Sequence, residues 1–314
     1  MIDGSTLKEF TFLDAGLTAP TVLSGSAAAS PGSVGEGDSR GNFTIEQEKN
    51  MDLGLRGKSA VVSGSTAGIG LAIAAALASE GASVVVNGRT EARVAAAVEQ
   101  IRQKVKEAQV RGVAADLGTA DGVAAFLKQA PEADVLVNNL GIFEVKPFAE
   151  IPDADWLRFF EVNVLSGVRL TRHYLPAMQR KNWGRVIFIS SESAVHIPAE
   201  MIHYGMTKTA QVAVARGLAE SLAGTGITVN SVLAGPTASE GVGSFVRSVA
   251  QQQGVTPAEV ERGFFEKMRP TSLLKRFEKP EEVAAVVTFV ASAQGGIMNG
   301  TAVRADGGVV KAVL

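Results

Sequence analysis

Short apolar runs alternate with longer Ala-rich or amphipathic stretches along most of the chain. The run at residues 59–63 ends in glycines, which is typical of a buried parallel strand. Farther on, Val94, Val98 and Ile101 recur at nearly the period of a helix. These patterns predict strands at 59–63, 83–87, 110–115, 134–138, 185–190, 226–232 and 301–304, and helices at 69–79, 91–108, 119–129, 153–179, 204–223 and 280–291.

Strands that alternate with helices predict a parallel sheet with helices on both faces. We therefore expect an α/β fold: one Rossmann-type, doubly wound parallel sheet of about seven strands, in a single domain over residues 51–314. Residues 236–275 interrupt the alternation and are predicted to be a variable substrate-binding segment. Residues 1–50 contain a Gly/Ser-rich tract without periodicity, which predicts a flexible, disordered N-terminal extension.

Composition and charge exclude several classes of protein. Apolar residues make up 46% and charged residues 20%, an ordinary globular balance. The net charge of −2 provides no field for nucleic acid or an anionic membrane. The chain has no cysteine, so disulfides, thiolate catalysis and cysteine zinc sites are excluded. The N-terminus lacks the features of a signal peptide and no apolar run is long enough to span a membrane, so the predicted location is cytoplasmic.

A glycine-rich loop, Ser-Gly-Ser-Thr-Ala-Gly-Ile-Gly at residues 63–70, joins the first strand to the first helix. Residues without a Cβ let the backbone approach a pyrophosphate, and the amides of a helix N-terminus bind the anion. The spacing is not that of a Walker loop. The loop predicts a dinucleotide site that includes Gly64, Ser65, Thr66, Gly68, Ile69 and Gly70.

The end of the second strand bears on the choice of dinucleotide. Gly88 occupies the position expected for an acid that would bind the adenosine ribose, and Arg89 follows it. This favours NADP(H) over NAD(H), although Arg89 is alternatively a solvated residue before a helix. After the third strand, Asp116 is a candidate partner for the adenine amino group; the alternative is a turn residue.

The stretch from Ser191 to Lys208 holds the candidate chemistry. Tyr204 and Lys208 are four residues apart and share one face of a predicted helix. A neighbouring ammonium group is expected to lower the pKa of a phenol. Ser190 and Ser193 compete with Ser191 for a place beside the tyrosine. No carboxylate pattern accompanies the histidines at 196 and 203, so we expect substrate-pocket or surface residues and no metal site.

Together these residues resemble the short-chain dehydrogenase/reductase family, of the single-domain type with a Tyr-x-x-x-Lys active site. The resemblance extends from about residue 53 to 308 and departs from the family pattern at Ser63, Leu140 and Ala234. It also includes Asp116, Leu117, Asn138, Gly141, Asn163, Asn230, Gly235 and the Asp-Gly-Gly at 306–308.

The resemblance implies a role for each matching residue. Tyr204 would be the general acid or base. Lys208 would bind the nicotinamide ribose and lower the Tyr204 pKa. Ser191 would bind the substrate oxygen, and Asn163 would hold a water that relays protons to Lys208. The cofactor would also contact Leu117, Asn138, Gly141, Gly235 and Thr237, beside Arg89 and Asp116.

The implied activity is hydride transfer between NADP(H) and a small-molecule carbonyl or secondary alcohol, in a homo-oligomer that is a tetramer or dimer. Apolar residues in the variable segment favour a fairly apolar substrate, with Phe264 and Phe265 as candidates for a lid. Three alternatives stay open: a non-catalytic dinucleotide sensor, an NAD(H)-preferring dehydrogenase of the same family, and an epimerase or dehydratase on the same fold.

Overall fold

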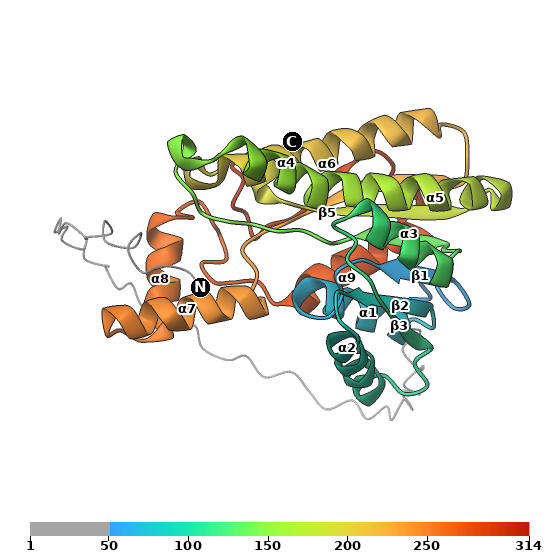
Figure 1. Cartoon of the computed structure of the whole chain (residues 1–314), viewed down its shortest axis with the longest axis horizontal. Coiled ribbons are helices and arrows are strands. Elements are labelled where there is room, and N and C mark those ends of the chain that lie inside the picture. Colours follow the sequence, from blue (N-terminus) through green and yellow to red (C-terminus); the bar gives the residue numbers. More distant parts are fainter. Residues whose placement is uncertain (1–50, 314) are drawn as a thin grey trace, which may run out of the picture. The chain divides into compact units, whose positions relative to one another are not determined.

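Seven parallel strands form one sheet in the order β3-β2-β1-β4-β5-β6-β7, which confirms the doubly wound α/β prediction (Figure 1). The computed structural model describes residues 51–313, so the predicted N-terminal extension at 1–50 lies outside the described residues. The strands are β1 (Ser59–Val62), β2 (Ser83–Gly88), β3 (Val110–Ala114), β4 (Val135–Asn138), β5 (Gly184–Ser191), β6 (Ile227–Ala234) and β7 (Ala302–Ala305).

Helices cover both faces of this sheet because successive strand residues point to opposite sides. Ala60 and Val62 pack toward α1, α2 and α9, whereas Val61 packs toward α3, α5 and α6. Within the described range, no helix is both long and apolar enough to cross a bilayer. The helices are α1 (Gly68–Ser79), α2 (Glu91–Lys104), α3 (Ala120–Gln129), α4 (Asp153–Phe160), α5 (Ser166–Lys181), α6 (Ile202–Ser221), α7 (Glu240–Gln253), α8 (Pro257–Lys267) and α9 (Pro280–Ala291).

The strand order reverses between β1 and β4, which opens a crevice at the carboxyl ends of these two strands. Hydrogen bonds hold the two loops of this crevice together. Ser63 Oγ accepts from the amides of Asn139 (2.9 Å) and Leu140 (3.0 Å). In return, Asn139 Nδ2 donates to the carbonyls of Ser63 (3.0 Å) and Gly64 (2.9 Å). The hydroxyl at position 63 therefore fixes the loop after β4 against the glycine loop.

The single helix expected at 153–179 is divided into α4 and α5 by a π-helical turn, η2 (Glu161–Leu165). Such turns insert a residue into the helical ladder and are frequent at functional sites. Asn163 lies at the centre of this turn. The apolar pattern continues across the turn, which is why the sequence alone predicts one uninterrupted helix.

The variable segment contains two capped helices, α7 and α8, which Figure 1 shows in orange beside each other. Thr256 and Glu259 form a capping box at the start of α8. The prediction of a lid at Phe265 is wrong, because this side chain is 1% exposed. Its ring packs 5.1 Å from those of Phe264 and Phe277, in an aromatic cluster that attaches α8 to the following loop.

Candidate active site

Residues from three separate elements meet at the carboxyl end of β5. Lys208, on α6, donates through Nζ to the carbonyl of Ile189 (2.9 Å), two residues before Ser191. The same nitrogen lies 5.6 Å from the ring centroid of Tyr204. A Cβ at Gly141 would lie 3.4 Å from Lys208 Nζ and 3.6 Å from Asn163 Oδ1. The candidate residues Asn163, Ser191, Tyr204 and Lys208 are therefore neighbours, with Gly141 leaving space among them.

Burial changes the pKa values of both titratable candidates, Lys208 and Tyr204. It lowers the pKa of Lys208 to about 8. It raises the pKa of Tyr204, and the nearby Glu192 carboxylate raises that pKa further, while the Ser191 hydroxyl and the more distant Arg269 lower it. The Tyr204 pKa is thus raised, and not lowered as expected, because burial is the largest cause. The Lys208 ammonium donates to Ile189 O and to Gln211 Oε1 (3.2 Å). The phenol stays protonated at neutral pH.

The Asn163 side chain makes three hydrogen bonds to neighbouring segments. Its Oδ1 accepts from the amide of Ile142 (2.7 Å), and its Nδ2 donates to Ile142 O (3.0 Å) and Thr207 Oγ1 (2.9 Å). The side chain therefore joins the loop after β4 to α6. Gln211 Nε2 donates to the Asn163 carbonyl (2.6 Å), so a side chain connects Asn163 to Lys208. The sequence signal for Gln211 was a polar residue one turn after Lys208 on an Ala-rich helix.

The three serines at the end of β5 have distinct partners. Ser190 Oγ donates to the Lys208 carbonyl (2.9 Å) and is used by the backbone of α6. Ser193 Oγ donates to Glu192 Oε2 (3.0 Å). Ser191 is the last residue of β5, donates to the Glu192 carboxylate, and is the serine whose hydroxyl lowers the Tyr204 pKa. These contacts favour Ser191 as the serine beside the tyrosine.

The glycine loop has the backbone shape that was expected of it. Gly64 and Gly68 have φ of +60° and +55°. A Cβ at Gly70 would lie 2.4 Å from Asn139 Nδ2, so only glycine allows α1 to approach the loop after β4. Ser65 contributes differently, since it is fully buried and its Oγ donates to Val62 O (2.6 Å). Its amide donates to Asn87 O (2.8 Å), so neither the side chain nor the amide of Ser65 is open to a ligand, contrary to the prediction, while Thr66 and Ile69 remain partly exposed.

The predicted adenosine end is formed by the loops after β2 and β3. A Cβ at Gly88 would lie 2.4 Å from Thr66 Cγ2, so this strand end has no room for an acidic side chain. Arg89 is exposed and makes no ion pair with the residues that the structure describes. Asp116 is exposed, and its Oδ1 accepts from the amide of Gly118 (3.0 Å), as expected of the alternative turn role. Leu117 is 1% exposed and its side chain packs in the core, so the structure does not present it to a ligand as predicted.

The remaining cofactor candidates line the crevice less directly. Asn138 Nδ2 donates to Thr171 Oγ1 (3.2 Å), which ties β4 to α5 instead of facing the crevice. A Cβ at Gly235 would lie 2.4 Å from Glu278 Oε1, and Thr237 Oγ1 donates to Gly235 O (3.0 Å). Glu278, which the sequence did not single out, is 5% exposed, and burial raises its pKa to about 7.

His203 is neither a pocket residue nor a surface residue. It is fully buried between Trp156 and Phe159, with ring centroids 6.0 and 4.0 Å away, and burial lowers its pKa. It packs α4 against α6, whereas His196 is exposed as expected. In the described part of the chain, no group of three His, Asp or Glu side chains is arranged to hold a metal ion.

A doubly wound sheet with a glycine loop at its switch point defines the dinucleotide-binding Rossmann class. The short chain dehydrogenase family model matches residues 58–249. The uncharacterized oxidoreductase YvaG of Bacillus subtilis strain 168 is 49% identical over 263 residues, covering 84% of this chain and 100% of the relative. The chain therefore belongs to the short-chain dehydrogenase/reductase family of oxidoreductases, which bind NAD(P)(H).

Two solved structures from this family differ in their cofactor. L-sorbose reductase from Gluconobacter frateurii, complexed with NADPH and L-sorbose, is 31% identical with a TM-score of 0.79, covering 84% of this chain and 100% of the other. A 7α-hydroxysteroid dehydrogenase complexed with NADH is 28% identical with a TM-score of 0.72, covering 84% and 98%. Overall similarity therefore does not distinguish NADPH from NADH for this chain.

Proposed function

We propose that this protein interconverts a carbonyl and a secondary alcohol with NADP(H), and that Tyr204 is its general acid and base. One observation carries the proposal: Ser191, Tyr204 and Lys208 meet at the end of β5, next to the crevice that the glycine loop borders. Membership of the oxidoreductase family supplies the reaction class. A non-catalytic sensor would have no use for this group of side chains.

The residues at the crevice suit a dinucleotide. The amides at the start of α1 and the left-handed glycines of the loop are suited to a pyrophosphate. The absence of a Cβ at Gly141 leaves space next to Lys208 Nζ for a ribose. When bound, the nicotinamide supplies the hydride.

The side chains then handle the proton and the developing charge. Burial keeps the Tyr204 phenol protonated, which is the form needed to donate to a carbonyl oxygen that is being reduced. Lys208, whose pKa is about 8, is largely protonated at neutral pH and offers an ammonium N–H to the ribose side. Ser191 lies beside the phenol and would bind the same substrate oxygen once its hydroxyl hydrogen turns from Glu192 to the substrate.

The preference for NADP(H) is supported by the end of β2. Gly88 is packed against Thr66, so no acid binds the ribose hydroxyls there, and the exposed Arg89 is available to a 2′-phosphate. Arg89→Ala should raise the KM for NADPH much more than the KM for NADH. Arg102→Ala, at the far end of α2, is the control and should change neither. Equal changes for the two cofactors at position 89 would contradict the preference.

Tyr204→Phe tests the assigned chemistry. The assay follows nicotinamide absorbance with NADPH and a panel of ketoses, 3-oxoacids, and cyclic and aromatic ketones. The variant should lose turnover by at least about 10²-fold, while NADPH binding changes little. The matched control is Tyr174→Phe, since the chain has only two tyrosines and Tyr174 lies in the core with its hydroxyl bonded to Ala130 O. Full turnover in Tyr204→Phe would remove the phenol from the mechanism.

We also propose that the protein is a homo-oligomer that associates through α4. Leu157 is 71% exposed and Phe160 is 37% exposed on this helix, so two large apolar side chains of one helix face solvent. Leu157→Glu should shift the mass measured by light scattering toward the monomer. A wild-type protein that is already monomeric at working concentration would exclude this proposal.

A further inference from the structure

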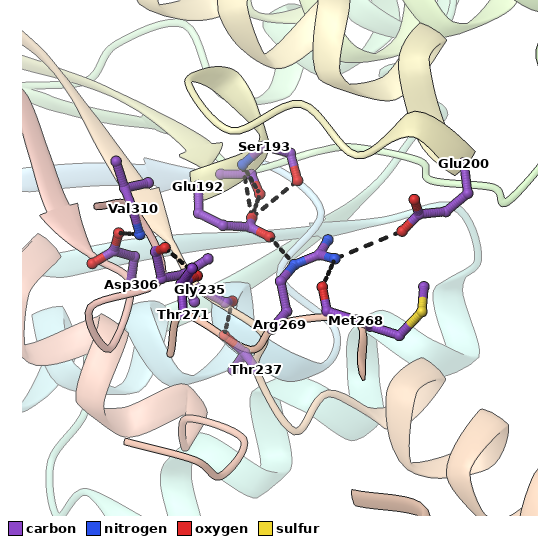
Figure 2. Close-up of polar contacts among 12 residues, drawn as sticks. Glu192, Ser193, Glu200, Gly235, Thr237, Met268, Arg269, Thr271, Asp306 and Val310 are labelled. Atoms are coloured by element: carbon purple, nitrogen blue, oxygen red, sulfur yellow. Dashed lines mark hydrogen bonds and ion pairs between the residues drawn. The ribbon is translucent and has the colours of Figure 1, made fainter. Parts of the chain in front are cut away.

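A buried ion pair lies beside the proposed catalytic hydroxyls. Arg269 Nε donates to Glu192 Oε1 at 2.9 Å, as Figure 2 shows, and the two side chains are 9% and 5% exposed. Removing both charges from water costs roughly what their attraction returns, so a buried pair is weak evidence of a stabilising role. The neighbours of the pair point to a role in the site.

The second oxygen of Glu192 collects donors from the end of β5. Glu192 Oε2 accepts from the Ser193 amide (2.8 Å), from Ser193 Oγ (3.0 Å) and from Ser191 Oγ. A carboxylate only accepts hydrogen bonds, so the hydroxyl hydrogen of Ser191 is directed to Glu192. The Ser193 amide also donates to Ser191 Oγ (3.1 Å). The orientation of the Ser191 hydroxyl is therefore determined by Glu192.

Arg269 fixes the carboxylate from the opposite side. It directly follows the C-cap of α8, and its Nη1 donates to the Met268 carbonyl (2.8 Å) and lies 3.6 Å from Glu200 Oε1. Figure 2 shows the guanidinium between Glu192 and Glu200. A residue at the end of the variable segment is thus connected, through one carboxylate, to Ser191.

We propose that Glu192 and Arg269 form a positioning pair that orients the Ser191 hydroxyl and sets the electrostatic field at Tyr204. The proposal rests on the function assigned above to Ser191 and Tyr204. Neither member of the pair needs to touch the substrate. The pair acts through the two hydroxyls, and Arg269 makes the site depend on the position of α8.

The two members have opposite effects on the phenol. Glu192 raises the pKa of Tyr204, and Arg269 lowers it. The other charged group near the phenol is Lys208, one turn along α6, while Glu200 faces Arg269. The charges of Glu144, Asp155, Lys146 and Arg158 act on His203, on another side of α6.

Because Glu192 and Arg269 shift the Tyr204 pKa in opposite directions, a titration of Tyr204 distinguishes this electrostatic role from a purely structural one. Tyrosine labelled at the hydroxyl-bearing ring carbon gives two NMR signals, because the chain has two tyrosines, and Tyr204→Phe assigns them. In the free enzyme, the Tyr204 signal should begin to titrate at lower pH in Glu192→Gln and at higher pH in Arg269→Met. In the double variant Glu192→Gln/Arg269→Met, which leaves neither charge of the pair unpaired, the Tyr204 signal should begin to titrate at a pH between these two. Glu282→Gln, in an exposed pair with Arg276, is the control and should match the wild type.

The titration needs neither cofactor nor substrate, so its result does not depend on whether the proposed function is correct. Equal onsets in all variants, or shifts of the same sign in both single variants, would overturn the electrostatic role. If the wild-type protein turns over no carbonyl of the panel, the function proposed for the site is overturned instead.

A kinetic cycle tests the orientation of Ser191. With the best substrate of the panel, Glu192→Gln should lower kcat/KM in the wild-type background and have a smaller effect in Ser191→Ala, where only its action on Tyr204 remains. Fully additive losses would show that Glu192 does not act through Ser191. Wild-type thermal transitions in Glu192→Gln, Ser191→Ala and their combination would show that the cycle compares folded proteins.

Discussion

Replacing Glu278 with glutamine should stabilise the protein above about pH 4.5, and most of all at neutral and alkaline pH. The Glu278 side chain is 5% exposed, and its Oε1 accepts no hydrogen bond from residues 51–313. Its other oxygen accepts a long hydrogen bond from the Gly235 amide (3.3 Å), and the charge of Asp306 is nearby. Burial, the largest cause, raises the pKa of this carboxyl from 4.5 to about 7. The folded protein therefore disfavours the charged form.

The size and sign of the effect follow from linkage. Between pH 4.5 and about 7 the folded state holds a proton that the unfolded state has released, so the free energy of unfolding falls as the pH rises through this window. At 1.36 kcal/mol for each pH unit, the full effect is about 3 kcal/mol. Glutamine is neutral at every pH. Glu278→Gln should therefore match the stability of the wild type near pH 4.5 and exceed it by up to about 3 kcal/mol above about pH 7.

Urea unfolding of both proteins, repeated from about pH 5 to about pH 8.5, measures this difference as a function of pH. The control is Glu281→Gln, an exposed carboxylate in the first turn of α9, which should not reproduce the pH dependence. A stability difference that is the same at every pH would refute the reasoning, because it would show that Glu278 titrates alike in the folded and unfolded states.

Three further changes test other parts of the structure. Gly88→Asp should weaken NADPH binding, since the Cβ position lies 2.4 Å from Thr66 Cγ2; unchanged affinity in a fluorescence titration would contradict this. Phe126→Ala removes a ring with 0% exposure and should cost about 3–5 kcal/mol of unfolding free energy, checked by urea unfolding; a loss below about 1 kcal/mol would argue against it. Gln211→Leu removes an acceptor from the Lys208 ammonium, so the Lys208 pKa should fall below about 8. As the pH is raised, the variant should then lose turnover at a lower pH than the wild type. An unshifted pH profile would show that Gln211 does not support the charge.

The order of strands and helices was readable from the sequence because each element carries its own periodicity. Apolar runs such as 59–63 mark strands buried on both faces, and the parallel sheet follows from their alternation with helices. The glycine loop and the Tyr204–Lys208 spacing are likewise local patterns. These features predicted the Rossmann class, and the combined motifs suggested the family to which the chain belongs.

Contacts between distant segments leave no such pattern. Glu192 and Arg269 are 77 residues apart, and Gly235 and Glu278 are 43 apart, so nothing in either stretch signals its partner. The π turn at Asn163 is equally invisible, because one inserted residue hardly alters the apolar period.

The sequence by itself determined the fold class and the set of residue types available for the chemistry. The tertiary structure decided their proton affinities and partners. It buried the Tyr204 phenol near Glu192, which reversed the expected direction of the Tyr204 pKa, and it gave Lys208 the acceptors Ile189 O and Gln211 Oε1. The physical reason is that a pKa depends on solvation and on neighbouring charges, and both are fixed only when remote parts of the chain pack together.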